Sequence, residues 1–277
     1  MLTTGTALRF WLLNLGAPLL GALALFLAFD LTDLDLAFSN LFWDPVAGQF
    51  PLEHNHLFEK ITHKWARIIP DWTGEGAIVL VLLSVLWPVL ARFPASLPTR
   101  LVEAIRLGPL LRFAQRHRWD ALFVVAAFAA STGAIHYLKS HTSVYCPIET
   151  TLYGGQHLRM EWFSNFSLWT SPGAGRCWPG GHASSAFSLF ALYFVARRYR
   201  WRYAKVLLQL ALLLGMVYGT TRVLQGWHYM SHTLWAAVTV WLSTLAIALL
   251  FYGRARLQQP LLAPTDTTGH AASEPIT

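Results

Sequence analysis

Six long runs of uncharged residues constrain this chain more than any other feature. They cover residues 10–29, 76–91, 121–138, 177–196, 206–221 and 233–252. A helix needs about 20 mostly apolar residues to cross the roughly 30 Å hydrocarbon core of a bilayer. Charged residues make up only 13% of the chain, about half their usual share in a soluble domain. We therefore predict an all-α membrane protein with six transmembrane helices, in which the shortest runs extend into flanking residues.

The basic residues predict how these helices are oriented. About two-thirds of the 21 Lys and Arg side chains fall on one side of the six spans, and most of the 14 carboxylates fall on the other. By the positive-inside rule, both chain ends are cytoplasmic, and segments 30–75, 139–176 and 222–231 face the periplasm of a bacterial inner membrane. The net charge of +7 then reports topology and does not indicate nucleic-acid binding. No small-x-small site follows the first run, so we expect it to be a retained helix and not a cleaved signal peptide.

We predict one six-helix membrane domain over residues 1–257 and a disordered cytoplasmic tail over residues 258–277. Residues 56–69 have the spacing of an amphipathic helix that lies at the membrane interface. Both cysteines, Cys146 and Cys177, belong to the second outer segment or its end. In an oxidising compartment they favour one disulfide. A pair of buried free thiols is the alternative, because sequence does not show how closely the two α-carbons approach.

Several ionisable side chains gather at the predicted outer ends of the helices. Lys139 ends the third span, His182 begins the fourth, Arg222 ends the fifth, and His228 and His232 precede the sixth. Such side chains are costly at a membrane border unless they are solvated or paired, so their convergence indicates a functional site. Taken singly, the lysine and the arginine could each be a snorkelling anchor. Together they supply fixed positive charge beside two or three imidazoles.

The stretch PGGH, from Pro179 to His182, offers a backbone surface for an anion. The N–H groups of Gly180, Gly181 and His182 stand at a predicted helix N-terminus, where no side chain obstructs a phosphate. The imidazole beside them can exchange a proton with that phosphate. Two imidazoles would divide the chemistry, one attacking phosphorus and the other protonating the leaving oxygen.

Three motifs carry a resemblance to a known family. They read KSHTSVYCP from Lys139 to Pro147, PGGH from Pro179 to His182, and TRVLQGWHYMSH from Thr221 to His232. In order and spacing they resemble the K-x6-R-P, P-S-G-H and S-R-x5-H-x3-D motifs of the phosphatidic acid phosphatase type 2 superfamily, which contains membrane lipid phosphatases. The resemblance implies a catalytic core over residues 139–232 in a six-helix membrane domain.

The resemblance also implies roles for individual residues. His228 would be the nucleophile that forms a phosphohistidine, and His182 the acid that protonates the leaving group. Lys139 and Arg222 would hold the phosphoryl oxygens as negative charge develops. This chemistry uses no metal and no cofactor. A site at the outer rim suits an amphiphilic lipid phosphate: undecaprenyl diphosphate, phosphatidylglycerophosphate or phosphatidic acid, or a lipid A phosphate.

Three positions depart from the family motifs. Cys146 stands in place of the arginine, and Arg176, or else Arg159, would replace its charge. Gly180 stands in place of the serine, which leaves only backbone donors. His232 stands in place of the aspartate that orients the nucleophile; as a neutral imidazole it can accept a hydrogen bond but supplies no negative charge. Glu149 or Glu161 would be the substitute carboxylate.

These departures leave alternative functions open. A lipid phosphotransferase would use the same residues, because only the acceptor differs. His228 and His232, four residues apart on a helix, could join His182 in a three-imidazole zinc site. If the altered motif positions have abolished catalysis, the protein would bind lipid phosphates or transport them without hydrolysing them. A membrane cytochrome with His136 as a haem ligand fits less well, because the histidines cluster on one rim instead of pairing across the membrane. The expected partners are the bilayer and its lipid substrate.

Overall fold

The structure is a computed structural model, and it describes residues 4–262 except 66, 95 and 96. Within these residues the chain consists of helices and loops, without a strand. The N-terminal helix runs unbroken through α1 (Thr4–Trp11), the π-helical η1 (Leu12–Gly16), α2 (Ala17–Leu25) and η2 (Phe26–Asp30). The later long helices are α5 (Ile68–Leu90), α8 (Arg118–Ser140), α12 (Ala204–Leu224) and α13 (Met230–Leu257). Shorter helices are α3 (Leu34–Asn40), α4 (His56–Glu59), η3 (Lys60–Trp65), α6 (Leu97–Ala104), α7 (Gly108–Arg116) and α9 (Trp162–Asn165).

Five of the described helices are long and apolar enough to cross a membrane: Gly5–Asp30, Ile68–Leu90, Arg118–Ser140, Ala204–Leu224 and Met230–Leu257. Each contains one of the predicted runs. Large apolar side chains on their outer faces are exposed, among them Leu20, Leu82 and Leu213, each more than 60% exposed. Exposed leucines along entire helices indicate contact with lipid and not with water. The described chain is therefore helical, and its five long apolar helices are compatible with a multi-pass membrane protein.

The predicted fourth span, residues 177–196, is not one long helix. It is divided into α10 (Gly181–Phe187) and α11 (Phe190–Arg198), so helix length supports five of the six predicted spans. Serine hydroxyls explain the break. Ser184 donates to the carbonyl of Gly181 at 2.7 Å, and Ser188 donates to that of Ser184 at 3.0 Å. Such local side-chain bonds compete with the backbone ladder and bend or interrupt a helix.

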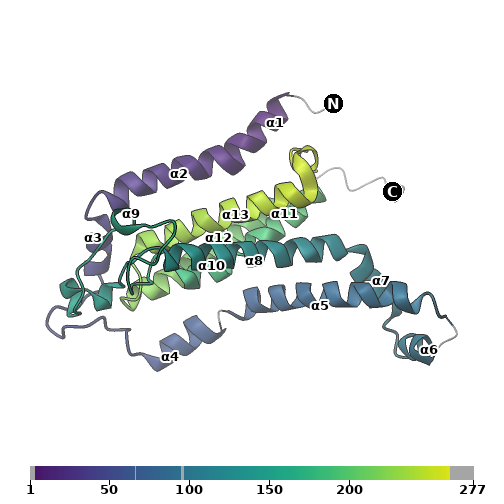
Figure 1. The fold of residues 1–277 in the computed structure, drawn as a ribbon, viewed down its shortest axis with the longest axis horizontal. Helices are drawn as coiled ribbons and strands as arrows, with labels where there is room; N and C mark the ends of the chain where they lie inside the picture. The colour runs from purple at the N-terminus through teal and green to yellow at the C-terminus, as the bar shows by residue number, and fades with distance from the viewer. Residues whose placement is uncertain (1–3, 66, 95–96, 263–277) are drawn as a thin grey trace.

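The core of the bundle is formed by α8 and α10–α13, with α1–α2 on one side and α5 on the other (Figure 1). Two glycines bring α12 close to its neighbours. A Cβ atom on Gly215 would overlap the ring of Phe187 in α10, and one on Gly219 would overlap the side chain of Thr233 in α13. The backbone of α12 thus packs directly against side chains of α10 and α13. These three helices carry predicted catalytic residues, and the close packing fixes their relative positions.

One end of the bundle is covered by the loops and short helices of residues 31–55 and 141–180, while both described chain ends lie at the other end (Figure 1). Stacked Trp162 and Trp178 rings, 4.7 Å apart between centroids, hold the loop cover together. The predicted interfacial helix over residues 56–69 consists of α4 and η3, and α5 begins at Ile68. Of the predicted tail, residues 258–262 lie against the bundle, where the N–H of Leu262 donates to the carbonyl of Arg200 at 2.8 Å. Residues 263–277 lie outside the described part.

Candidate functional site

The structure brings the predicted ionisable residues together at the loop-covered end of the bundle. Lys139 stands in the last turn of α8, and His182 in the first turn of α10. Arg222 stands in the last turn of α12, His228 in the turn that follows, and His232 in the first turn of α13. Five segments of the sequence thus place one side chain each around a single point. The centre of this group is His228, whose ionisation is influenced by the charges of the other four.

The ring of His228 is held by its Nδ1 atom. This nitrogen lies 3.1 Å from Sγ of Cys177 and 3.4 Å from Nδ1 of His232. Cys177 is disulfide-bonded and has no S–H, so a hydrogen bond between the two requires His228 to donate from Nδ1. In that tautomer Nε2 carries the free lone pair. The contact therefore orients the ring and leaves Nε2 as its basic nitrogen.

The charge state of His228 follows from its surroundings. Burial, together with the positive charges of Lys139 and Arg222, holds the pKa of His228 well below its usual range. A histidine with such a pKa is neutral at pH 7 and keeps a lone pair available for attack on an electrophile. The same positive groups attract an anion. The site is thus arranged for an anionic ligand beside an uncharged imidazole.

Lys139 is fixed across the beginning of α10. Its ammonium donates to the carbonyl of Arg176 at 2.6 Å and lies 3.4 Å from that of Cys177. A Cβ atom on Gly181 would come within 3.3 Å of the Lys139 side chain. Glycine at this position therefore makes room for the lysine as well as for a ligand.

Arg222 is oriented by Gln225, whose Oε1 accepts from its guanidinium at 2.8 Å. This bond uses one of the five N–H donors of the arginine.

The two glycines have different roles, and the prediction for Gly180 is wrong. Its N–H does not face a ligand, because it donates to the carbonyl of His232 at 2.8 Å. A Cβ atom at this position would lie 3.1 Å from the same carbonyl oxygen, so glycine permits the close approach. Gly181 and His182 are the first two residues of α10, where N–H groups have no acceptor inside the helix. The backbone bond from Gly180 ties the start of α10 to the start of α13.

Cys146 and Cys177 form a disulfide, with 5.2 Å between their α-carbons. The alternative of two free thiols does not describe this structure. The N–H of Cys177 also donates to the carbonyl of Val144 at 2.8 Å. The bond joins the two ends of the loop between α8 and α10, and its Cys177 sulfur lies against the ring of His228. Cys146, where a phosphate-binding arginine was expected, is thus joined covalently to the sulfur that contacts His228.

In the structure the guanidinium groups of the two arginines predicted to replace that charge have partners of their own, although Arg159 lies over the ring of Tyr229, next to His228. The guanidinium of Arg176 donates to the carbonyls of Gly173 at 2.6 Å and Gly175 at 2.8 Å, and to the hydroxyl of Ser171 at 2.7 Å. It therefore holds the loop in shape. Arg159 forms an ion pair with Glu161 at 2.6 Å. Each guanidinium group thus bonds to the loop cover through some of its donors, Arg176 to carbonyls and a hydroxyl and Arg159 to a carboxylate.

The predicted substitute carboxylates also have other partners. Glu149 accepts from the N–H of Cys146 at 2.7 Å, and Glu161 is paired with Arg159. The carboxylates that contact the start of α13 are instead Asp30 and Asp35. Asp30 accepts from the indole of Trp235 at 2.8 Å, and Asp35 accepts from the N–H of Ser231 at 2.9 Å. Asp35, which is 2% exposed, thus caps the helix that carries His232. It lies 196 residues away in sequence, so no local motif could have revealed it.

The carboxyl group of Asp35 leads to a prediction about pH. Burial raises the pKa of Asp35 from 3.8 to about 6, because an apolar environment disfavours the charged form. The folded protein prefers the protonated acid, so stability is highest below about pH 4, falls as the pH rises through about 6, and stays lower above it. Asp35→Asn keeps an acceptor for Ser231 but does not ionise. We expect it to be more stable than the parent at about pH 8 by roughly 2–3 kcal/mol, with no gain at about pH 4.

Thermal unfolding of detergent-purified protein at the two pH values measures this difference. Asp33→Asn is the matched control, because the Asp33 side chain is 87% exposed and its change should give no pH-dependent gain. Equal stabilisation by Asp35→Asn at both pH values would show that ionisation of this carboxyl does not affect stability.

The arrangement of histidines bears on the metal alternative. Within the described residues, the ligand atoms of His182, His228 and His232 do not all lie within 4.8 Å of one another. The group that does meet this distance consists of Cys146, Cys177 and His228. Its two sulfurs are joined to each other, whereas a metal is bound by thiolates. Among the described residues, the three imidazoles are therefore not gathered as closely as that group.

Comparison with known proteins gives one match. The family model described as PAP2 superfamily matches residues 120–256, which extend from α8 to the end of α13 and include every residue of the histidine group. No curated protein and no solved structure matches the chain significantly. The matched segment is about half of the chain and includes the core of the bundle and the 141–180 part of its loop cover.

Proposed function

The chain belongs to the PAP2 superfamily, whose members are generally phosphatases, and from this premise we propose that it is an integral membrane lipid phosphatase. The proposal rests mainly on the surroundings of His228. A neutral imidazole, oriented through Nδ1, stands among Lys139, Arg222 and His182. This is the environment that attack on a phosphoryl group requires, since the nucleophile needs a lone pair and the phosphate needs positive charge.

The proposed first step forms a phosphohistidine. Nε2 of His228 attacks phosphorus, and the bond between phosphorus and the lipid oxygen breaks. His182 gives its proton to that oxygen, so the lipid leaves as an alcohol or, from a diphosphate, as a monophosphate. Lys139 and Arg222 stabilise the negative charge on the phosphoryl oxygens. His228 becomes positively charged when its Nε2 is bonded to phosphorus, and Nδ1 keeps its proton.

The second step is hydrolysis. His182, now neutral, takes a proton from a water molecule as the water oxygen bonds to phosphorus. The bond between phosphorus and Nε2 breaks, inorganic phosphate leaves, and His228 returns to its neutral form. Gly181 lies beside Lys139 and would place the start of α10 against the phosphoryl group. Arg176 is excluded from the phosphate-binding set, because its guanidinium holds the loop.

The location of the histidine group limits the substrate class. It lies at the end of a bundle whose outer surface is apolar, so a phosphate in the headgroup layer can reach it while its hydrocarbon chains remain in lipid. We propose that this end faces the periplasm of a bacterial inner membrane and that both chain ends are cytoplasmic. The candidate substrates are undecaprenyl diphosphate, phosphatidylglycerophosphate or phosphatidic acid, and lipid A phosphate.

An assay of phosphate release tests the proposal. Detergent-purified protein is incubated with each candidate lipid in the presence of EDTA, and both inorganic phosphate and phosphorylated lipid products are measured. We expect phosphate release from at least one lipid, unchanged by EDTA. His136→Gln, which alters an exposed histidine of α8 that is not among the proposed site residues, serves as the matched control and should retain activity.

The other outcomes contradict the proposal in different ways. Activity that EDTA abolishes and zinc restores would indicate a metal-dependent hydrolase. Transfer of phosphate to a second lipid without release of inorganic phosphate would indicate a phosphotransferase. Binding of lipid phosphates without either product would indicate a non-catalytic lipid-phosphate-binding protein.

A further inference from the structure

A second site for a charged ligand lies at the opposite end of the bundle. A cavity of about 280 Å³ opens between the N-terminal helix, α11, the start of α12 and the residues after α13. Along α13, the 25 residues between His232 and Leu257 correspond to roughly 37 Å of helix. The cavity is therefore separate from the histidine group, and nothing that binds in it can reach His228 at the same time.

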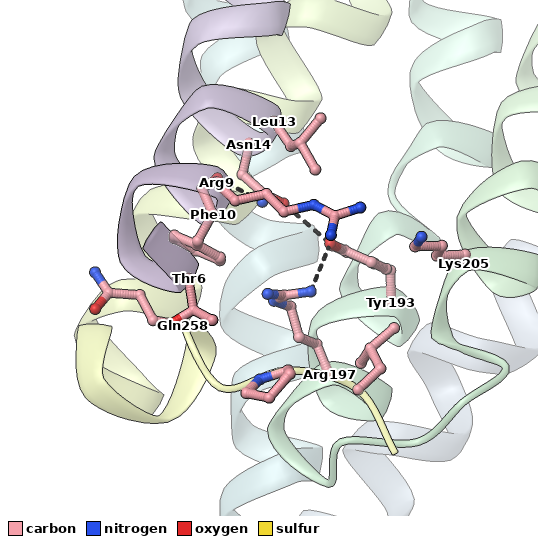
Figure 2. A pocket seen from close by; sticks show the side chains of 11 residues that line it. Thr6, Arg9, Phe10, Leu13, Asn14, Tyr193, Arg197, Lys205 and Gln258 are labelled. Atoms are coloured by element: carbon pink, nitrogen blue, oxygen red, sulfur yellow. Dashed lines mark hydrogen bonds between the residues drawn. The ribbon is translucent and has the colours of Figure 1, made fainter. Parts of the chain in front are cut away.

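The cavity is lined by positive charge. Figure 2 shows the side chains of Arg9, Arg197 and Lys205 extending into it from three different helices. None of the residues that line it is a carboxylate. In the part of the chain that the structure describes, neither Arg9 nor Lys205 forms an ion pair, and both residues are exposed. Three cations without a neighbouring carboxylate repel one another unless an anion lies between them.

The floor of the cavity is built from buried polar groups. The hydroxyl of Tyr193 donates to Oδ1 of Asn14 at 3.0 Å, and Nδ2 of Asn14 donates to the carbonyl of Phe10 at 2.8 Å (Figure 2). Asn14 is 3% exposed. Arg197 is fixed above this floor, because its Nε donates to the carbonyl of Leu257 at 2.6 Å. The position of one cation is therefore set before any ligand arrives.

An apolar groove continues from this cavity along the bundle. It has a volume of about 260 Å³ and shares Leu13 with the charged cavity. Ala17 and Pro18 of the N-terminal helix form one wall, and Phe190 and Trp241 belong to the opposite side. The groove contains no charged residue and lies between helices whose outer faces are lipid-exposed. A hydrocarbon chain fits such a surface, whereas a soluble anion gains nothing from it.

We propose that the charged cavity and the apolar groove together bind one anionic phospholipid. Its phosphate lies among Arg9, Arg197 and Lys205, and one of its chains lies along the groove past Leu13. Basic pockets between transmembrane helices recognise lipid phosphates through this combination of charge and depth. The lipid is a bound component at the end of the bundle remote from the histidines. The inference does not depend on the phosphatase reaction.

Lipid retention measures this binding. The full-length protein is placed in nanodiscs of phosphatidylcholine with a minor share of phosphatidylglycerol, released, and examined by native mass spectrometry. Arg9→Gln with Lys205→Gln removes the two exposed cations among the three that line the cavity. We expect phosphatidylglycerol to bind about tenfold more weakly to this double variant. Arg254→Gln with Arg256→Gln is the matched control: it removes two exposed charges at the same end that do not line the cavity.

The groove has its own variant. Ala17→Phe with Ala237→Phe fills the space for the chain without changing any charge, and it should lower phosphatidylglycerol retention severalfold while the protein unfolds at the same temperature. Three results would overturn the inference. Equal losses in the arginine control and the cavity variant would mean that only the overall surface charge matters. Displacement of the lipid by inorganic phosphate would indicate a site for a free anion. Unchanged phosphatidylglycerol retention in the groove variant would show that the hydrocarbon chain of the lipid does not lie in the groove.

Discussion

Replacement of His228 by alanine is expected to lower kcat for lipid phosphate hydrolysis by at least about a thousandfold. In the proposed reaction this side chain supplies the atom that bonds to phosphorus, and no other described group can take its place. The ring is held through Nδ1 by Cys177 and His232, so that Nε2 alone is available. A nucleophile removed from such a site leaves only the rate that Lys139 and Arg222 provide by holding the phosphate.

The measurement has two parts. Steady-state hydrolysis compares His228→Ala with the parent and with His136→Gln, the exposed histidine control. Acid-labile, base-stable label from a phosphorus-labelled lipid, trapped by rapid quenching, then identifies the covalent intermediate. The label should be on residue 228 in the parent and missing in the variant. Full hydrolysis by His228→Ala, or label on another residue, would exclude His228 as the nucleophile.

His232→Asp is expected to raise the rate of phosphohistidine formation by about ten- to a hundredfold. An aspartate Oδ1 and a histidine Nδ1 are both two bonds from Cβ, so the carboxylate oxygen would take the place of the nitrogen that lies 3.4 Å from His228. Nδ1 of His228 would then donate to a full negative charge. The imidazolium formed during attack would be stabilised, as in catalytic triads, where loss of the charged partner costs several powers of ten.

The His232→Asn variant tests whether the effect of aspartate at position 232 comes from its charge or from its shape. Asparagine has the size of aspartate and an oxygen at the same position, but it carries no charge, so the variant should be no faster than the parent. Single-turnover rates, measured by rapid quenching at about pH 7, report the phosphoryl-transfer step directly. Equal rates for the aspartate and asparagine variants would show that the charge of residue 232 does not limit the reaction.

Much of the fold follows from simple features of the sequence. Runs without charge correspond to the five long apolar helices, because lipid tolerates few charged side chains along a helix. The fourth run has the same composition, but hydroxyls of Ser184 and Ser188 bond to nearby carbonyls and divide it. The amino-acid composition of the run does not reveal this competition between serine hydroxyls and backbone N–H groups, because it depends on the rotamer that each serine adopts.

The site was predictable where its residues belong to local motifs and unpredictable where it depends on distant partners. Lys139, His182 and Arg222 lie at helix ends on the loop-covered side of the bundle, and His228 lies in the turn between α12 and α13, so the topology brings them together. The backbone bond from Gly180 to His232 and the cap that Asp35 provides for α13 both join segments far apart in the chain. Arg176 carries the right charge at a suitable place in the sequence, but nearby carbonyls take up its donors.

The disulfide between Cys146 and Cys177 separates the sequence of the loop from the spacing of the residues at its ends. Without this bond, a change inside a long loop could also move those residues. The 31-residue separation it spans contains short helices and exposed aromatic side chains such as Phe163 and Trp169. Because the bond fastens the loop at its two ends, insertions or exchanges inside it would leave the spacing between Lys139 and His182 unaltered. If the proposed function is correct, the segment that meets a lipid headgroup can vary in sequence without a change in the geometry around His228.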